Sequence, residues 1–417
     1  MRGENILAPR SFIERFAKIL RLAEPDNIVI THHNDADGIT SAYILKTALE
    51  RKNYNTRLIC VEALFPEIIK KINDIASNLV IYIDIGASIA STLFRMHKNE
   101  NFAVIVDHHI PDTTNVVHGK NFLLINPEIW GISGDLAASC STITYVIAKY
   151  MDRTNTDLAH LAVIGAIGDG HHRVSGRLLG LNRRALADAV AAGQVEVRLR
   201  HGKEIYLDKY FNHMDMSIIS DILTTLGVIG YYSNGPQLGL RTCEEGVSEF
   251  IIAEVTRLEK LKEKLFGKVM DELKERGLKI RKFVQWFNVE NRFEPMGIGS
   301  IGMFCDLLKN ANFIDKNKYI IGFQMMNPYI PNIGYLHTRI LKLSMRVPDK
   351  LEMKIRKKEI PGFDEILIPT VKMLNGLVYS CHKSIGAAAL VKANRYIELI
   401  ELIDQRIRYL VNASDGK

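Results

Sequence analysis

Acidic and histidine residues gather at four places in the first half of this chain, and each group follows a short apolar run. The groups, each given with the run before it, are His33 to Gly38 after 28–30, Asp84 after 79–83, Asp107-His108-His109 after 102–106, and Asp169 after 161–168. Short runs rich in β-branched residues predict buried parallel strands. Ligands of open α/β sheets bind at the carboxyl ends of such strands. We therefore expect the four groups to meet at one edge of a sheet.

The residue types in these groups are those that hold divalent metal ions. The candidates are His33, Asp35, Asp37, Asp84, Asp107, His108, His109 and Asp169. So many carboxylates in one crevice would repel one another unless cations neutralised them. A mixed set of imidazoles and carboxylates favours Mn²⁺, with Mg²⁺ as the other possibility. The number of ligands predicts two ions, and two ions about 3.5–4 Å apart stabilise the attacking and leaving oxygens of a displacement at phosphorus.

Each group alone has an ordinary structural interpretation. A single Asp-x-Asp-Gly is usually a turn, and a single His-His is more often a surface or core pair. The ordered set of four favours the metal site over four unrelated features.

The same residues resemble the motifs of a known family, the DHH phosphoesterases, with the RecJ-like exonucleases as the closest branch. The matching segments are His33-x-Asp35-x-Asp37-Gly38, Asp84, Asp107-His108-His109 and Asp169, as motifs I to IV. The metal ligands implied are His33 with Asp35 for one ion, Asp37 with His108 for the other, and Asp84 with Asp169 as bridges. We expect His109 to donate to a non-bridging phosphate oxygen as charge develops there. Asp107 is either a further ligand or a residue that orients the histidines.

The C-terminal part resembles the DHH-associated domain of that family. Ser344 and Arg346 match its Ser-x-Arg strand, and the segment 380–388 is similar to a Gly-Gly-His loop that grips the phosphate backbone. Ser380-Cys381 replaces the two glycines, so the backbone is expected to approach a ligand less closely. The expected substrate-binding residues are Arg346, His382, Ser344 and Gly386, with His171 and His172 beyond Asp169 as further candidates. The alternative is a packed strand arginine, a capping histidine and surface loop residues.

Composition restricts the class of protein. The chain has 417 residues and five scattered cysteines without a Cys-x-x-Cys pair, which favours reduced thiols in a cytoplasmic protein. Its N-terminus lacks the apolar region of a signal peptide, and no run reaches the length of a membrane span. The net charge is +7 although the expected crevice is acidic, so the basic excess lies elsewhere and suits a polyanionic substrate.

The alternation of strands and helices predicts an α/β fold with a doubly wound, mainly parallel sheet. We expect a DHH catalytic domain over 1–198, an insertion and linker helix over 199–282, and a smaller C-terminal α/β substrate-binding domain over 283–417. The expected helices are 11–22, 40–51, 65–77, 87–98, 136–151, 176–193, 248–276 and 392–411. The glycine-rich segment 227–236 predicts loop and turn.

Three functions fit these patterns. The first is a RecJ-like exonuclease on single-stranded DNA or RNA in DNA repair, acting with replication or repair proteins. Its aromatic stacking candidates are Tyr231, Tyr232, Trp286, Phe287 and Tyr329. The second is a phosphodiesterase for short oligonucleotides or cyclic dinucleotides. The third is a non-catalytic replisome scaffold related to RecJ, which the retention of every motif ligand disfavours.

Overall fold

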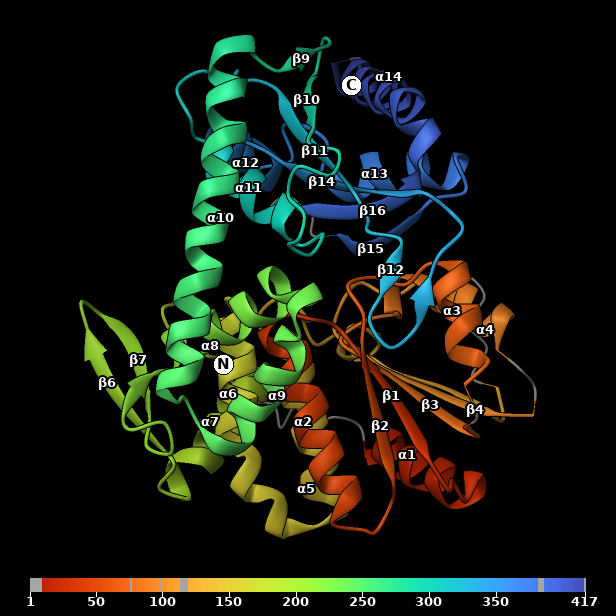
Figure 1. Ribbon diagram of the computed structural model, residues 1–417, viewed down its shortest axis with the longest axis vertical. Helices are drawn as coiled ribbons and strands as arrows, with labels where there is room; N and C mark the ends of the chain where they lie inside the picture. The colour runs from red at the N-terminus through yellow and green to blue at the C-terminus, as the bar shows by residue number, and fades with distance from the viewer. Residues whose placement is uncertain (1–9, 76, 98–99, 113–118, 382–385, 416–417) are drawn as a thin grey trace. The chain divides into compact units, whose positions relative to one another are not determined.

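The computed structural model describes residues 10–75, 77–97, 100–112, 119–381 and 386–415 of the chain (Figure 1). Two compact units are present. The first consists of Met1–Arg257 with Pro331–Ile333, and the second of Leu258–Ile330 with Gly334–Lys417. The boundary falls inside the long helix α10 (Glu249–Arg276), which confirms the helix expected there. Gly277 follows it with a φ of 71°, the left-handed conformation of a helix C-cap.

The first unit is built on a parallel sheet of five strands. They are β1 (Ile28–His32), β2 (Thr56–Cys60), β3 (Leu79–Ile83), β4 (Phe102–Val106) and β5 (Phe122–Ile125). Their order is β2-β1-β3-β4-β5, all parallel. This is a doubly wound sheet, and its strand order reverses between β1 and β3. In such sheets the ligand crevice lies outside the carboxyl ends of the strands at this switch point.

Both faces of this sheet are buried. Alternate strand residues such as Ile28 and Ile30 belong to a core with helices α1 (Arg10–Ala23), α2 (Ala36–Glu50) and α5 (Cys140–Met151). The residues between them, Val29 among them, are buried as well. This part of the chain also contains helices α3 (Pro66–Asn73), α4 (Ala90–Met96) and α7 (Gly180–Ala191) and the 3-10 turns η1 (Ala87–Ile89), η2 (Pro127–Trp130) and η3 (Arg153–Leu158). The helices expected over this part of the chain are thus present, with ends shifted by a few residues.

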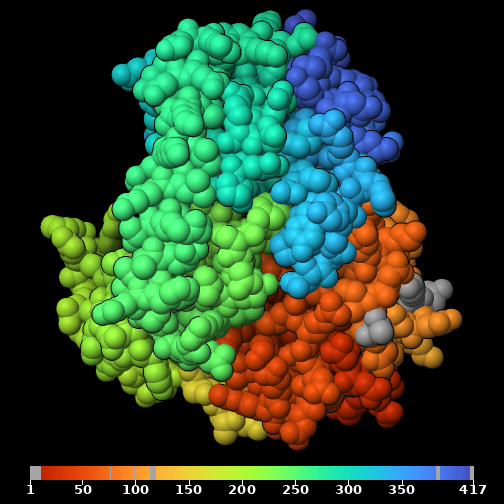
Figure 2. Space-filling view, in the orientation of Figure 1, coloured from red at the N-terminus to blue at the C-terminus, as the bar shows by residue number. Residues whose placement is uncertain are grey.

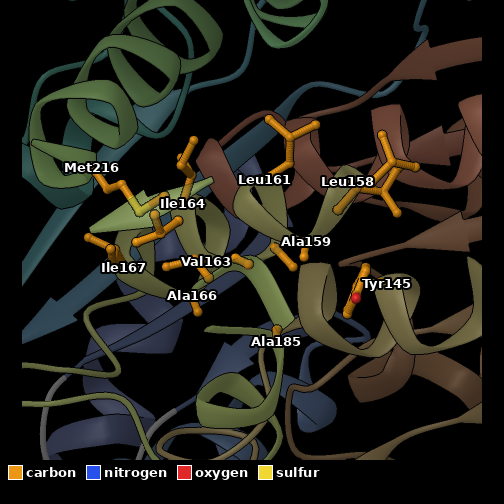
Figure 3. Close-up of a cluster of buried hydrophobic side chains, with 14 of the residues drawn as sticks. Tyr145, Leu158, Ala159, Leu161, Val163, Ile164, Ala166, Ile167, Ala185 and Met216 are labelled. Carbon is orange, nitrogen blue, oxygen red and sulfur yellow. The ribbon is translucent and has the colours of Figure 1, made fainter. Parts of the chain in front are cut away.

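The run 161–168 is not the strand that the sequence predicted. It lies in helix α6 (Ala159–Gly168), whose residues are buried on all sides except at Gly168. A helix that is apolar all round belongs to the interior, and periodicity cannot separate a short apolar run of a strand from a buried helix. Figure 3 shows Val163, Ile164 and Ile167 of this helix among the apolar side chains of the core. Asp169 therefore follows a helix and not a strand.

The segment 227–236 is helical and not the loop and turn expected from its glycines. Helix α8 (Met216–Thr224) continues into a π-helical turn, η4 (Thr225–Ile229), and the 3-10 turn η5 (Tyr231–Ser233) leads to α9 (Gly235–Glu245). A Cβ added at Gly227 would lie 1.7 Å from the carbonyl oxygen of Asn34. The glycine permits close contact between two segments, a use of glycine that local sequence does not distinguish from a turn.

The second unit carries a mixed sheet of the order β15-β16-β14-β11-β10-β9. Its strands are β9 (Lys279–Ile280), β10 (Val284–Asn288), β11 (Tyr319–Met325), β14 (Ile340–Arg346), β15 (Leu377–Cys381) and β16 (Ala387–Lys392). Helices α12 (Asp349–Arg356), α13 (Phe363–Met373) and α14 (Tyr396–Asp415) share its main core. Helix α11 (Ser300–Leu308) contacts β11 and β14, and a short hairpin joins β12 (Tyr329–Ile330) to β13 (Gly334–Tyr335). The late helix expected over 392–411 corresponds to the 3-10 turn η6 (Ala393–Arg395) and α14.

None of the described helices combines the length and the apolar character that crossing a membrane requires.

Candidate metal centre

Strand register brings the first three groups of ligands together. His32 of β1 lies opposite Ile83 of β3, and Ile83 lies opposite Val106 of β4. The residue after each strand continues this alignment, because the His33 nitrogen donates to the Ile83 carbonyl at 3.2 Å and the Asp84 nitrogen to the Val106 carbonyl at 2.9 Å. His33, Asp84 and Asp107 thus leave neighbouring strands side by side, as the sequence predicted.

Asp84 lies between two histidines and offers one oxygen to each. Its Oδ2 is 3.6 Å from His33 Nδ1, and its Oδ1 is 3.4 Å from His108 Nε2. Its backbone has a φ of 58°, in the left-handed region that favours glycine, asparagine and aspartate. The Oδ1 atom is buried and has no hydrogen-bond partner among the described residues. A buried carboxylate with one oxygen toward each of two imidazoles is suited to bridge two cations.

The first side of the centre consists of His33, Asp35 and Asp84. His33 Nδ1 is 2.7 Å from Asp35 Oδ2, while Asp35 Oδ1 accepts from the Gly38 nitrogen at 2.9 Å and caps α2. Burial alone would lower the pKa of His33, but Asp35 and Asp84 outweigh it and raise that pKa well above its usual value. Burial alone would raise the pKa of Asp35, yet the charge of His33 brings it below its ordinary range. The imidazole and these carboxylates therefore favour each other's charged forms.

The second side is centred on His108. Its Nε2 is 3.1 Å from Asp169 Oδ2, 3.4 Å from Asp84 Oδ1 and 3.9 Å from Asp37 Oδ2. Its Nδ1 donates to the Gly134 carbonyl at 2.8 Å, which directs Nε2 toward the carboxylates. Asp37 accepts from the backbone nitrogens of Cys140 at 2.7 Å and Ser141 at 3.0 Å, at the start of α5.

Crowding and burial oppose the ionisation of the carboxylates on this second side. Burial, followed by the charge of Asp84, raises the pKa of Asp37 to about 6. Burial, followed by the charge of Asp37, raises the pKa of Asp169 well above its usual value. Asp169 Oδ2 is buried and without a hydrogen-bond partner among the described residues. Two oxygens without partners beside imidazole nitrogens fit divalent cations, which would remove the repulsion.

Asp107 is already engaged by the protein. Its Oδ2 accepts from the Ala87 nitrogen at 2.8 Å, and its Oδ1 accepts from the His108 nitrogen at 2.7 Å. The same Oδ1 is 2.8 Å from His109 Nδ1. Burial opposes ionisation of Asp107, but His109 and these contacts bring its pKa down to about 2. The geometry favours the second of the two expected roles, a carboxylate that orients the histidines.

His171 and His172 differ in their surroundings. His171 is buried, its Nε2 is 3.7 Å from Asp169 Oδ2, and its Nδ1 is 2.7 Å from the side-chain amide of Asn182. It forms a group with His108 and Asp169 whose ligand atoms all lie within 4.8 Å of one another. His172 belongs to no such group of the described residues, and burial, followed by the charge of Arg173, lowers its pKa. His171 is therefore a candidate ligand, which the sequence suggested only as a substrate contact.

In the second unit, Ser344 and Arg346 lie on one face of β14. Arg346 Nε donates to Asp306 at 2.8 Å and its Nη1 donates to Ser344 Oγ at 3.1 Å. A Cβ added at Gly386 would lie 2.3 Å from Arg346 Nη1, so this glycine leaves room for the guanidinium. Lys342, two residues before Ser344, is a buried cation over the ring of Tyr379 that sequence reasoning missed. His382 lies outside the described residues.

The stacking candidates are mostly interior residues. Tyr231, Trp286 and Phe287 are buried, and the Tyr232 hydroxyl donates to Glu62 at 2.9 Å. Tyr329 is the exposed member of the five, and its ring centroid is 5.2 Å from that of Tyr335.

The sequence analysis did not identify two glycines that support residues of the candidate metal centre. On α6, a Cβ at Gly165 would lie 2.4 Å from Asp37 Oδ1 and 2.3 Å from Ser141 Oγ. At the π-helical turn, the Gly227 carbonyl accepts from Asn34 Nδ2 at 3.0 Å and holds the loop between β1 and α2. A glycine inside an apolar helical run signals close packing, but the run around Gly165 was interpreted as a strand.

Part of the chain matches a family model and a curated relative. Residues 27–166 match the model of the DHH family, N-terminal domain. An uncharacterized protein of Methanocaldococcus jannaschii is 34% identical over 164 residues, which are 39% of this chain and 36% of that protein. The match thus spans about a third of this curated relative.

Two solved structures resemble the chain over nearly its whole length. RecJ of Thermus thermophilus, in complex with Mn²⁺, is 15% identical with a TM-score of 0.58, covering 96% of this chain and 54% of RecJ. CDC45 of Entamoeba histolytica is 11% identical with a TM-score of 0.55, covering 95% of this chain and 99% of CDC45. At these identities the likeness is one of fold.

Proposed function

We propose that this DHH-family protein, RecJ-like in fold, is a phosphodiesterase that depends on divalent metal ions and hydrolyses single-stranded DNA or RNA from an end. The observation that carries the proposal is the position of Asp84, with one carboxylate oxygen toward His33 and the other toward His108. A single metal would need only one of these two sides. The buried oxygens of Asp84 and Asp169 that have no described hydrogen-bond partner both face His108 and support a cation on that side. The cluster of His33, Asp35 and Asp84 supports a cation on the other side.

The proposed ligands rest on the distances around Asp84 and His108 and, for the sharing of Asp169, on the resemblance to the DHH phosphoesterases. His33, Asp35 and Asp84 would hold one ion, and Asp37, His108 and Asp169 the other, with Asp84 and Asp169 shared and His171 as an additional donor. Bound there, Mn²⁺ or Mg²⁺ supplies electrostatic stabilisation of charge at phosphorus and makes water a better nucleophile. The crystal structure of RecJ with Mn²⁺ supports this choice of metals.

His109 is proposed to donate a proton or hydrogen bond to a phosphate oxygen. Asp107 orients the ring through Nδ1 at 2.8 Å, so the nitrogen proposed to contact the substrate is Nε2. The carboxylate raises the pKa of His109 against the effect of burial, which keeps the imidazole able to donate.

The second unit is proposed to bind backbone phosphates beyond the scissile one. Arg346, held by Asp306 and Ser344 and given room by Gly386, presents a planar guanidinium suited to phosphate. The five cysteines are all free and buried, which supports a reducing compartment such as the cytoplasm.

A scaffold function has one observation in its favour, the fold that the chain shares with CDC45. The set of carboxylates and imidazoles around Asp84 favours the enzyme. Single-stranded DNA and RNA of several lengths, labelled at the 5′ or the 3′ end and incubated with Mn²⁺ or Mg²⁺, test the proposal. Metal-dependent shortening from one end supports an exonuclease. Activity on dinucleotides alone would favour the short-oligonucleotide alternative, and no hydrolysis of any substrate would favour the scaffold.

A further inference from the structure

A short β-hairpin stands out from the helical part of the first unit. Strands β6 (Val195–Arg200) and β7 (Lys203–Asp208) are antiparallel and are joined by two residues, His201 and Gly202. Both have positive φ, 50° and 75°, as in the tight turns that match the twist of two strands. Figure 1 shows the hairpin projecting beyond α7 and α8, and in Figure 2 its yellow-green atoms form an outer corner of this unit. The turn fixes the positions of the residues on either side of it.

Those residues are two cations without an acidic partner. Arg200 lies directly opposite Lys203 in the hairpin register, and like charges in this position destabilise a hairpin. Among the described residues, no carboxylate lies within salt-bridge distance of either one, and both are exposed. Arg198, on the same face of β6, is different because its Nε donates to Glu196 at 2.7 Å. An uncompensated pair of cations at a fixed tip is a surface that an anion would stabilise.

The hairpin is fastened to the segment that begins at Asp169. The Glu204 nitrogen donates to the Gly176 carbonyl at 2.8 Å, and the Leu178 nitrogen donates to the Tyr206 hydroxyl at 2.9 Å. A Cβ added at Gly176 would lie 3.2 Å from Lys203 Cγ.

The same segment supplies two further exposed arginines, Arg173 and Arg177. Exposed basic side chains thus occur both on the segment that follows Asp169 and at the tip of the hairpin attached to it.

We propose that Arg200 and Lys203 bind backbone phosphates of the nucleic-acid strand that the metal centre hydrolyses, at nucleotides outside that centre. The inference rests on the proposed function for the identity of the polyanion. Single strands are held by basic grooves that follow the backbone, and an arginine beside a lysine offers a planar fork and a mobile ammonium to neighbouring phosphates. The hairpin would thus extend the binding site for long strands only.

Binding is measured with a fluorescently labelled single strand, in the Asp84→Asn background so that no strand is cut. For each phosphate that is no longer bound, the salt slope of the affinity falls by about 0.7, which is roughly fivefold in affinity at about 0.1 M salt. Arg200→Ala/Lys203→Ala should therefore weaken binding on the order of 25-fold and lower the slope by about 1.4. Arg198→Ala, on the same face but paired with Glu196, should change binding little. Arg57→Ala/Lys70→Ala, also exposed, controls for net charge.

Three outcomes would overturn the inference. The double alanine variant could bind long strands as tightly as the Arg57/Lys70 control. The swap Arg200→Lys/Lys203→Arg, which keeps both charges, could bind as weakly as the alanine variant. The alanine variant, made in the otherwise unchanged protein with Mn²⁺, could lose hydrolysis of a dinucleotide as well as of long strands. The wild-type protein could hydrolyse no phosphodiester, while Arg200→Ala/Lys203→Ala still weakens strand binding. That result would refute the proposed function but support the binding site on the hairpin.

Discussion

At the scale of single residues, Asp84 combines a charge with an unusual backbone conformation. Its carboxylate faces two histidines, and its φ of 58° lies where asparagine is tolerated and alanine is strained. We predict that Asp84→Asn lowers hydrolysis by more than about 100-fold, because a metal-stabilised transition state is worth several kcal/mol. Without metal, the melting temperature of Asp84→Asn should be no lower than that of the wild type without metal, because the substitution removes one of the carboxylates that repel one another. Initial rates with Mn²⁺ and calorimetric melting measure the two effects.

Asp84→Ala provides the matched comparison. It should be equally inactive but less stable than Asp84→Asn by about 1 kcal/mol, the cost of a left-handed conformation for a residue with an ordinary Cβ. Wild-type rates in either variant would contradict a bridging role for Asp84.

At the scale of elements, α6 packs so closely against α2 that only a glycine fits at position 165, next to the proposed ligand Asp37. A Cβ at Gly165 would collide with Asp37 Oδ1 and Ser141 Oγ. We predict that Gly165→Ala weakens metal binding by about 10–100-fold, as removal of a residue that supports a ligand does. It should also destabilise the protein by about 1–3 kcal/mol through overpacking. Titration with Mn²⁺ followed by melting temperature measures both.

Gly267 offers a matched control within α10. Nothing lies within 4 Å of a Cβ added there. Gly267→Ala should stabilise the protein by up to about 1 kcal/mol, because alanine is the better helix former, and should leave metal binding unchanged. An equal loss of metal affinity in both variants would show that the effect of Gly165→Ala is not local.

On β14, two variants separate the effect of the charge of Arg346 from the effect of the position of its guanidinium. Arg346→Ala should weaken binding to long strands and lower its salt slope by about 0.7, the value for one phosphate. Gly386→Ala keeps the charge but displaces the guanidinium, since its Cβ would lie 2.3 Å from Nη1. It should weaken binding with a smaller change in slope. Arg356→Ala, at an exposed position of α12 and paired with Glu352, is the control. If Arg346→Ala leaves both long-strand and dinucleotide cleavage unaffected, Arg346 is a structural strand residue.

At the scale of the whole molecule, metal binding and stability are linked. The cations would bind the folded centre, whereas the unfolded chain holds its ligands apart, so Mn²⁺ at about 100 times its dissociation constant should add about 2.7 kcal/mol to the free energy of unfolding. Mn²⁺ should act at lower concentration than Mg²⁺, because imidazoles are among the ligands. Melting curves with each metal, with chelator and with Asp84→Asn check this. Full hydrolysis in excess chelator would contradict the metal dependence.

The sequence was sufficient for the parallel sheet and for the position of the candidate ligands at the ends of its strands. His33, Asp84 and Asp107 follow short apolar strands, and parallel register alone places them side by side. It was insufficient for Asp169, because an apolar run of that length suits a strand or a buried helix equally. The roles of Gly165 and Gly227 depend on segments distant in sequence, which no local pattern records. The extent of each domain stays a prediction.

The hydrogen bond from Asn34 to Gly227 has a consequence for the order in which the protein is made. It joins residues 193 positions apart, and the first of them lies in the loop that carries Asp35 and leads into α2, where Asp37 lies. A nascent chain that has emerged from the ribosome as far as residue 198 already contains every proposed metal ligand. It still lacks the π-helical turn that supports the first motif, because residue 227 has not yet emerged. The proposed metal centre thus gains this support only after the turn has been synthesised, and an N-terminal fragment with every proposed ligand would lack the support for its first loop.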